Sequence, residues 1–305
     1  MSNPSTTVVV VTWRGRDHIT ACLDALAEQR PHRTVVLDNA SDDGTAALVA
    51  AHPSAPTTVR LPRNAGYAGA LAAVLPHVDT EFVAWLNDDA VPDASWLEHL
   101  ETALRGTPEA AAATSSLLLA DGSTQSVGVR LTADGHGADL VPAGREVFGF
   151  CGGAALLRTD VLKACGGVPR SFFCYYEDTD TAFRLRLAGH RVVSVGPARV
   201  RHRHGASTNP GSRLFHRWNE RNRLLMLLRC APAGVAVAQL ARFAALTAVL
   251  PLRSGPKPGN FRLPLRLQVL AEVLLRLPAT AVQRVAIGRR AKVSRAAVWR
   301  EWAGR

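Results

Sequence analysis

The feature that most constrains the fold of this chain is a regular alternation of strand-like and helix-like segments over its first ninety residues. The segments follow one another as strand 6–13, helix 17–29, strand 33–41, helix 45–52, short strand and loop 57–66, helix 67–78 and strand 81–86. Continuous apolar, β-branched runs are typical of strands buried on both faces of a parallel sheet. The alternation therefore predicts an α/β fold with a doubly wound, mostly parallel sheet and right-handed crossovers.

Polar side chains gather where two of these predicted strands end. Asp38 and Asn39 fall at the end of the second strand, and Asn87, Asp88 and Asp89 at the end of the fourth. Ligands of open α/β sheets bind beyond the carboxyl ends of the strands, so these residues predict a site. A hard divalent cation, Mg²⁺ or Mn²⁺, would neutralise the adjacent carboxylates and bind substrate phosphates. The alternative is a solvated loop with helix-capping acids.

Two further groups of residues could carry chemistry. Glu177 and Asp178 follow an aromatic run, which could desolvate a carboxylate and raise its pKa to a value useful for a general base. They could also be ordinary acids of a helix's first turn. His202 and His204 alternate with arginines at a strand end, where either could complete a metal site or belong to a solvated basic strand.

The glycine-punctuated loop 63–71 opens a predicted helix. It contains Asn64 and Gly66 but lacks the GxGxxG pattern of dinucleotide-binding folds, and it follows the third strand rather than the first. A helix N-terminus at this place could still hold a diphosphate.

Charge divides the chain into two parts. Residues 1–198 carry 15 basic and 22 acidic side chains, whereas residues 199–305 carry 21 basic and 3 acidic ones. A basic region can bind nucleic acid, but we expect no nucleic-acid partner because the chain shows no nucleic-acid-binding motif and little aromatic interleaving. The five cysteines have no zinc-like spacing and predict buried thiols.

Two segments of the basic region are apolar enough to meet a membrane. Segment 231–252 has transmembrane length, but Arg242 near its middle favours a helix lying in the membrane interface over a span. In segment 261–277, Arg262, Arg266, Glu272 and Arg276 fall within one arc and leucines fill the rest. This pattern predicts a basic amphipathic element at a membrane surface. The alternative is a helical subdomain with a solvated basic face.

The motifs, taken together and in order, resemble glycosyltransferase family 2, whose members are inverting enzymes of the GT-A fold. The resemblance includes the branch of rhamnosyl- and galactofuranosyltransferases of bacterial envelope polysaccharides. The matching stretches span about three-quarters of the chain and are VVVVTWRGRDHITACLDAL, VVLDNASDDGT, RNAGYAGA, WLNDDAVP, FCGGAALLRTDVL, FFCYYEDTDTAFRLRLAGHRVV, ARVRHRHGAS and ERNRLLMLLR.

The resemblance implies a role for each candidate residue. Asp178 is the catalytic base, and its neighbour Glu177 orients the acceptor. The last acid of the strand-end motif, Asp89, is the firmest metal ligand and is joined by His202, whose spacing selects it over His204. The residues implied to bind the nucleotide sugar are Thr12, Asp38, Asn64, Gly66, Asp88 and Asp89. Asn87 departs from the family, which usually has an acid there, although an amide oxygen can still coordinate a cation.

The predicted domains are a GT-A catalytic domain at 1–211 and a helical, basic, membrane-associating region at 212–305. Within the first, 1–110 is the nucleotide-sugar half and 111–211 the acceptor and catalytic half. We expect metal-dependent transfer of a sugar, rhamnose-like or another hexose, from a dTDP- or UDP-sugar to a lipid-linked or cell-envelope glycan. The N-terminal segment does not resemble a signal peptide, so we expect a cytoplasmic protein, peripheral at the inner face of the membrane.

Three alternatives remain open at this point. A sugar-phosphate nucleotidyltransferase has a similar fold but usually carries a glycine-rich loop after its first strand, and TWRGRDH has only one glycine. A glycosyltransferase could instead act on a small-molecule acceptor. A non-catalytic binding protein would not require the acids, the histidine and the glycine loop together.

Overall fold

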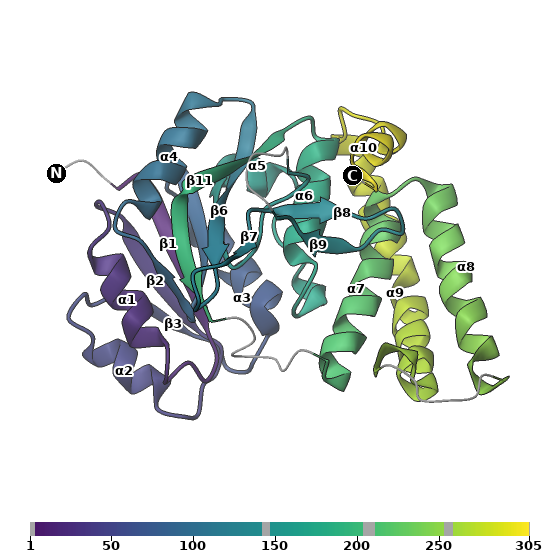
Figure 1. Cartoon of the computed structure of the whole chain (residues 1–305), viewed down its shortest axis with the longest axis horizontal. Helices are drawn as coiled ribbons and strands as arrows, with labels where there is room; N and C mark the ends of the chain where they lie inside the picture. Colours follow the sequence, from purple (N-terminus) through teal and green to yellow (C-terminus); the bar gives the residue numbers. More distant parts are fainter. Residues whose placement is uncertain (1–3, 142–146, 204–210, 253–258, 305) are drawn as a thin grey trace.

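The computed structural model of the chain describes residues 4–141, 147–203, 211–252 and 259–304. The first ninety residues form the predicted alternation of strands and helices (Figure 1). The elements are β1 (Thr6–Thr12), α1 (Ile19–Ala27), β2 (Arg33–Asp38), α2 (Thr45–Ala51), β3 (Thr57–Arg60), α3 (Gly66–Val74), the 3-10 helix η1 (Leu75–His77) and β4 (Phe82–Asn87).

These four strands form the parallel half of one large sheet. β1 pairs in parallel with both β2 and β4, and β2 pairs in parallel with β3. The sheet order is β3-β2-β1-β4-β10-β6-β11-β5, with β7 on β6, and the prediction of a mostly parallel sheet is confirmed. The later strands are β5 (Ala90–Pro92), β6 (Ala110–Leu118), β7 (Thr124–Ser126), β10 (Ala154–Arg158) and β11 (Arg191–His202), and a separate hairpin consists of β8 (Val129–Leu131) and β9 (Gly137–Asp139).

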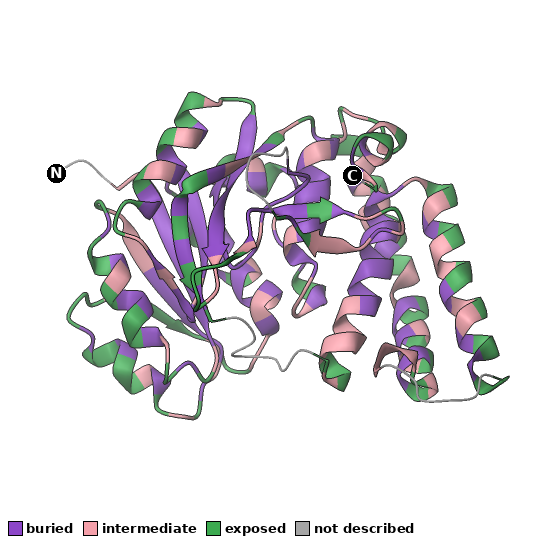
Figure 2. Cartoon of the chain, viewed as in Figure 1, coloured by how far each residue is buried: buried purple, intermediate pink, exposed green. Residues whose placement is uncertain are grey.

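Both faces of the sheet are covered, which explains the unbroken valine run of β1. All seven residues of β1 are buried. Val9 and Val11 face a core that includes α3, whereas Val8 and Val10 face a second core that includes α1 and α4 (Trp96–Gly106). Figure 2 shows the strands of this sheet largely buried. The carboxyl ends of β1 and β4 are therefore fixed by packing on both sides.

The rest of the chain is mainly helical. α5 and η2 connect β10 to α6, which leads into β11; α7 and α10 pack against α6, and α8 and α9 pack against α7 (Figure 1). Leu224, Leu225 and Leu227 belong to the same core as Phe148 and Phe183, so these helices are packed onto the sheet rather than tethered to it. The elements are α5 (Thr159–Ala164), η2 (Arg170–Phe172), α6 (Glu177–Leu187), α7 (Arg213–Cys230), α8 (Ala233–Val249), η3 (Leu250–Leu252), η4 (Gly259–Phe261), α9 (Leu263–Arg290) and α10 (Arg295–Trp302).

The polar arc of α9 faces the protein, which differs from both expectations for this segment. Glu272 is 9% exposed and accepts hydrogen bonds from Arg217 and Arg221 of α7. Arg266 is 2% exposed and donates to Thr247 Oγ1 of α8. The expectation that this arc lies in solvent or among lipid headgroups is wrong at these two residues, because α7 and α8 supply partners that offset their desolvation.

The opposite side of α9 is apolar and exposed. Leu275 is 80% exposed and Val282 70% exposed, and further exposed apolar side chains on the same helix are Leu267, Leu274 and Val285. On α8 and the turn that follows it, Val237, Val249 and Leu252 are also exposed. We call this surface the α8–α9 apolar face. Within the described residues, Ala233–Leu252 is the one helical segment that is long and apolar enough to cross a membrane, and little of it is buried.

Candidate active site

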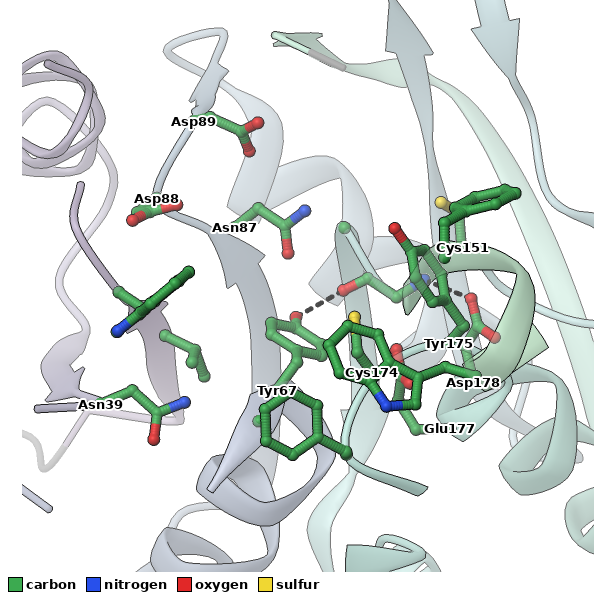
Figure 3. A pocket seen from close by; sticks show the side chains of 18 of the residues that line it. Asn39, Tyr67, Asn87, Asp88, Asp89, Cys151, Cys174, Tyr175, Glu177 and Asp178 are labelled. Atoms are coloured by element: carbon green, nitrogen blue, oxygen red, sulfur yellow. Dashed lines mark hydrogen bonds between the residues drawn. The ribbon is translucent and has the colours of Figure 1, made fainter. Parts of the chain in front are cut away.

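A cavity of about 650 Å³ opens at the carboxyl ends of β1 and β4. The end of β4 contributes Asn87, Asp88 and Asp89 to its wall, and the start of α6 contributes Glu177 and Asp178. Figure 3 shows the two acidic groups on opposite sides of this space. The structure thus brings together the two sets of acids that lie about ninety positions apart in the sequence.

The two strand-end acids turn in different directions. Asp88 accepts a hydrogen bond of 2.6 Å from the hydroxyl of Thr12 at the end of β1. Burial raises the pKa of Asp88 to about 7, and the nearby charge of Asp89 adds to this, although the bond from Thr12 favours the charged form. Asp89 instead lies beside His202, with 3.3 Å between Oδ1 and Nε2. The resemblance implies that Asp89 binds the metal and that Asp88 binds the nucleotide sugar, and in the structure the two carboxylates have different partners.

His202 ends β11, and both of its ring nitrogens have polar neighbours. Its Nδ1 lies 2.9 Å from Gln125 Oε1, an acceptor that orients the ring, and its Nε2 faces Asp89. Nε2 lies 3.2 Å from Asn87 Nδ2. A Cβ on Gly153 would lie 3.4 Å from Asn87 Nδ2 and 3.7 Å from His202 Nε2, so the glycine leaves this side of the cavity open.

These residues fit a divalent cation. Asp89 offers a carboxylate and His202 an oriented imidazole, and a set with few protein ligands suits Mn²⁺ or Mg²⁺, which keep positions for phosphates and water. Asn87 turns its amide nitrogen toward His202, so its oxygen would face the cation only with the amide group rotated. Among the described residues, no group of three or more His, Cys, Asp and Glu side chains is placed to hold a metal ion, so this set rests on two such side chains, Asp89 and His202. His204 lies outside the described residues.

In the acid pair at the start of α6, Glu177 is buried and Asp178 is half-buried and held by backbone. Asp178 accepts a hydrogen bond of 3.0 Å from Gly152 N, and the carbonyl of Gly152 accepts one of 2.6 Å from Tyr67 (Figure 3). Burial raises the pKa of Asp178, while the bonds from Gly152 and Thr179 act in the opposite direction. The carboxylate is therefore both anchored and facing the cavity.

Glu177 has a different environment from its neighbour. It is 6% exposed, and its Oε2 is buried without a hydrogen-bond partner among the described residues. Burial, together with the nearby charge of Asp178, raises the pKa of Glu177 to about 8. At neutral pH Glu177 is therefore mainly a neutral acid that can donate a hydrogen bond into the cavity.

The predicted nucleotide-binding residues are only partly at the cavity surface. Asn64 and Gly66 line it, and Asn64 Oδ1 accepts a hydrogen bond of 2.8 Å from Gly66 N. Thr12 and Asp38 are fully buried behind the wall. Asp38 accepts hydrogen bonds from Ser41 N and from Arg60, so it braces the end of β2. Direct contact of Thr12 and Asp38 with a nucleotide stays a prediction.

Several lining residues escaped sequence reasoning. Trp13, at the end of β1, lines the cavity, as does Asn39 at the end of β2, which the strand-end pattern had predicted. Phe215 and Trp218 of α7 also line it, and Trp218 lies 4.7 Å from Phe173, measured between ring centroids. The aromatic run at 172–176 was visible in the sequence, but nothing in it indicated that α7 would supply the matching rings.

The fold and the site define a glycosyltransferase of the GT-A class. The chain belongs to glycosyl transferase family 2, whose family model matches residues 7–166. It is 26% identical over 243 residues to an N-acetylglucosaminyl-diphospho-decaprenol L-rhamnosyltransferase of Mycobacterium tuberculosis. The alignment covers 68% of this chain and 79% of that relative. The expected family and enzyme class are confirmed.

Two solved structures show the same fold at low sequence identity. The mannosyltransferase PcManGT from Pyrobaculum calidifontis, in complex with GDP-Man and Mn²⁺, aligns with a TM-score of 0.54 at 21% identity and covers 99% of this chain and 80% of that one. S. aureus TarS in complex with UDP-GlcNAc aligns with a TM-score of 0.57 at 17% identity, over 94% of this chain and 87% of that one.

Proposed function

We propose that this glycosyltransferase transfers a sugar, with inversion and with a divalent cation, from a nucleoside diphosphate sugar to a hydroxyl of a lipid-linked or cell-envelope glycan. The observation that carries the proposal is the placement of Glu177 and Asp178 across one cavity from Asp89 and His202. A base and a phosphate-binding centre on opposite sides are what a single in-line displacement requires.

In this mechanism Asp178 is the base. Its carboxylate, anchored by Gly152 N, takes the proton of the acceptor hydroxyl as that oxygen forms a bond to the anomeric carbon. The bond from the anomeric carbon to the phosphate oxygen breaks, and the nucleoside diphosphate leaves from the opposite face. Glu177, neutral near pH 7, donates a hydrogen bond that orients the acceptor.

The other side of the cavity holds the leaving group. Asp89, His202 and Asn87 would hold the cation, which supplies positive charge to the departing diphosphate when bound. Trp13 and Asn39 line the wall at the ends of β1 and β2, where we place the base and ribose of a dTDP or UDP donor. The aromatic rings of Phe173, Tyr175 and Trp218 form a wall suited to the apolar face of a sugar.

A lipid-linked acceptor is supported by two observations. The relative from Mycobacterium tuberculosis is named for a diphospho-decaprenol acceptor. The α8–α9 apolar face is exposed on this chain, and large exposed apolar surfaces mark partner or membrane sites. We propose that this face lies on the cytoplasmic membrane surface, which would bring the cavity to an acceptor carried by a lipid.

Transfer activity tests the proposal. Thermal shifts with dTDP, UDP and GDP in the presence of Mn²⁺ identify the nucleotide, and release of that diphosphate from its sugar conjugates then measures transfer to polyprenyl-diphosphate glycans. Asp178→Asn should lower the rate by about 10²- to 10⁴-fold and leave the nucleotide shift intact, whereas the exposed Asp160→Asn should keep full activity. Near-full activity of Asp178→Asn would overturn the assignment of the base. Pyrophosphate release from a nucleoside triphosphate and a sugar phosphate would favour a nucleotidyltransferase.

A further inference from the structure

A second cavity, of about 420 Å³, lies away from the candidate active site and shares no lining residue with it. It is bounded by the turn after α5, by η2, by the ends of α6 and α7, and by α9. Four arginines line it, Arg170, Arg184, Arg229 and Arg290, and its lining contains no Asp or Glu among the described residues. Its volume is in the range of small-molecule sites.

Among the described residues, Asp180 is the acid that pairs with this group of arginines. The buried Asp180 accepts a hydrogen bond of 2.8 Å from Arg184 Nε, and its other oxygen lies 3.4 Å from Arg229 Nε. Arg184 also donates to the carbonyls of Cys165 and Gly167, so its guanidinium is occupied in holding the turn. Arg184 is therefore a structural part of the wall.

Arg229 is the less completely paired of the two buried arginines. Its side chain is 8% exposed, and its Nε, although 3.4 Å from Asp180 Oδ1, makes no hydrogen bond in the described part of the chain. The guanidinium lies 5.4 Å from the ring centroid of Phe172. A buried guanidinium that shares one carboxylate with Arg184 is incompletely compensated, and such a group is costly unless an anion completes it.

Two exposed arginines stand at the mouth of the same cavity. Arg290 lies against Gly166, where an added Cβ would meet its Nη1 at 2.8 Å, and Arg170 is at the start of η2. The side chains of Ser171 and Gln283 also line the cavity and can donate hydrogen bonds. Planar guanidinium groups around a cavity without acids match the oxygens of a phosphoryl group, which they bind in pairs.

We propose that this cavity binds a phosphoryl or diphosphoryl group, with Arg229 at its base and Arg170 and Arg290 at its mouth. The group belongs to a soluble phosphate compound or to a phospholipid headgroup, and the two sources share this chemistry. The segment that starts at Arg170 continues into Phe173, which lines the active-site cavity, so the two sites are joined by a few residues of chain.

The test compares binding by three forms of the full chain: wild type, the double variant Arg170→Gln/Arg290→Gln, and Arg289→Gln, a control at an exposed neighbouring position outside the cavity. Calorimetry with inorganic phosphate and with pyrophosphate, in EDTA, should give equal affinity for wild type and control. The double variant should bind at least about tenfold more weakly, since it lacks two charge-assisted contacts. Equal thermal stability of the three forms checks that folding is intact.

A second arm identifies the source of the phosphate. Sedimentation with phosphatidylcholine vesicles, with and without phosphatidic acid, measures how much binding the anionic headgroup adds. If the soluble anions do not bind, the site must bind the lipid headgroup. The double variant should then lose the part of vesicle binding that depends on phosphatidic acid, and the control should keep it. A double variant that matches wild type in both arms overturns the site.

Discussion

Replacing Glu177 with glutamine should make the protein more stable at neutral and alkaline pH, and the gain can be worked out from burial. The pKa of Glu177 rises from an ordinary 4.5 to about 8 in the fold. Between these values the folded protein keeps a proton that the unfolded chain has released, so stability falls as pH rises through this window and is fully present below 4.5. The slope is about 1.4 kcal/mol per pH unit.

From pH 5.5 to 7.5 the wild type should therefore lose about 2.7 kcal/mol relative to Glu177→Gln, an upper limit because Asp178 titrates beside it. A chain of this length shifts its melting temperature by about 2 °C per kcal/mol, so the difference in Tm between the two proteins should widen by about 5 °C across this range. Thermal unfolding at several pH values measures it.

The control for this measurement is the variant Glu98→Gln, which changes an exposed glutamate of α4. Its Tm should follow that of the wild type at every pH. If Glu177→Gln also runs parallel to the wild type from pH 5.5 to 7.5, Glu177 is ionised in the fold. The argument that it donates a hydrogen bond to the acceptor would then be refuted.

Two further predictions concern the metal centre and the membrane. His202→Ala should raise the Mn²⁺ concentration needed for half-maximal activity more than Asn87→Ala does, because the imidazole is an oriented ligand and the amide is the departure from the family. Titration of activity with Mn²⁺ measures both values, and a larger effect of Asn87→Ala would contradict the assignment. Leu274→Glu/Leu275→Glu should reduce sedimentation with anionic vesicles at least about tenfold without lowering activity on a soluble donor, since charges replace exposed apolar contacts. The control Leu48→Glu, an exposed leucine of α2, should bind vesicles as the wild type does.

Local patterns were sufficient to predict the sheet and most of the acids around the site. The valine run of β1 could only be a strand covered on both faces, and parallel strands then carry their following residues to one edge of the sheet. Asp88 and Asp89 follow from this geometry alone. Their separate orientations do not, because they depend on Thr12 and His202, which arrive from the ends of two other strands.

The aromatic wall of the cavity could not be predicted, because its parts come from distant segments. Phe173 lies in a turn before α6, and Trp218 lies in α7, forty-five positions later. Each ring alone is consistent with an ordinary core position. Only the packing of α7 beside α6 brings them to one surface, and no periodicity in either segment encodes that contact.

The amphipathic pattern of α9 shows a more general limit of prediction from sequence. An amphipathic pattern states that a helix has two unlike faces, but it does not state which face meets the protein. Here Glu272 lies within reach of Arg217 and Arg221, so polar residues share the inner side of the helix with Leu265 and Val269, while Leu267, Leu274 and Leu275 are left outside. Such a helix keeps its apolar side available without unfolding, which is what attachment to a membrane surface needs. The inverted arrangement therefore supports the membrane proposal more directly than the basic charge of the region that suggested it.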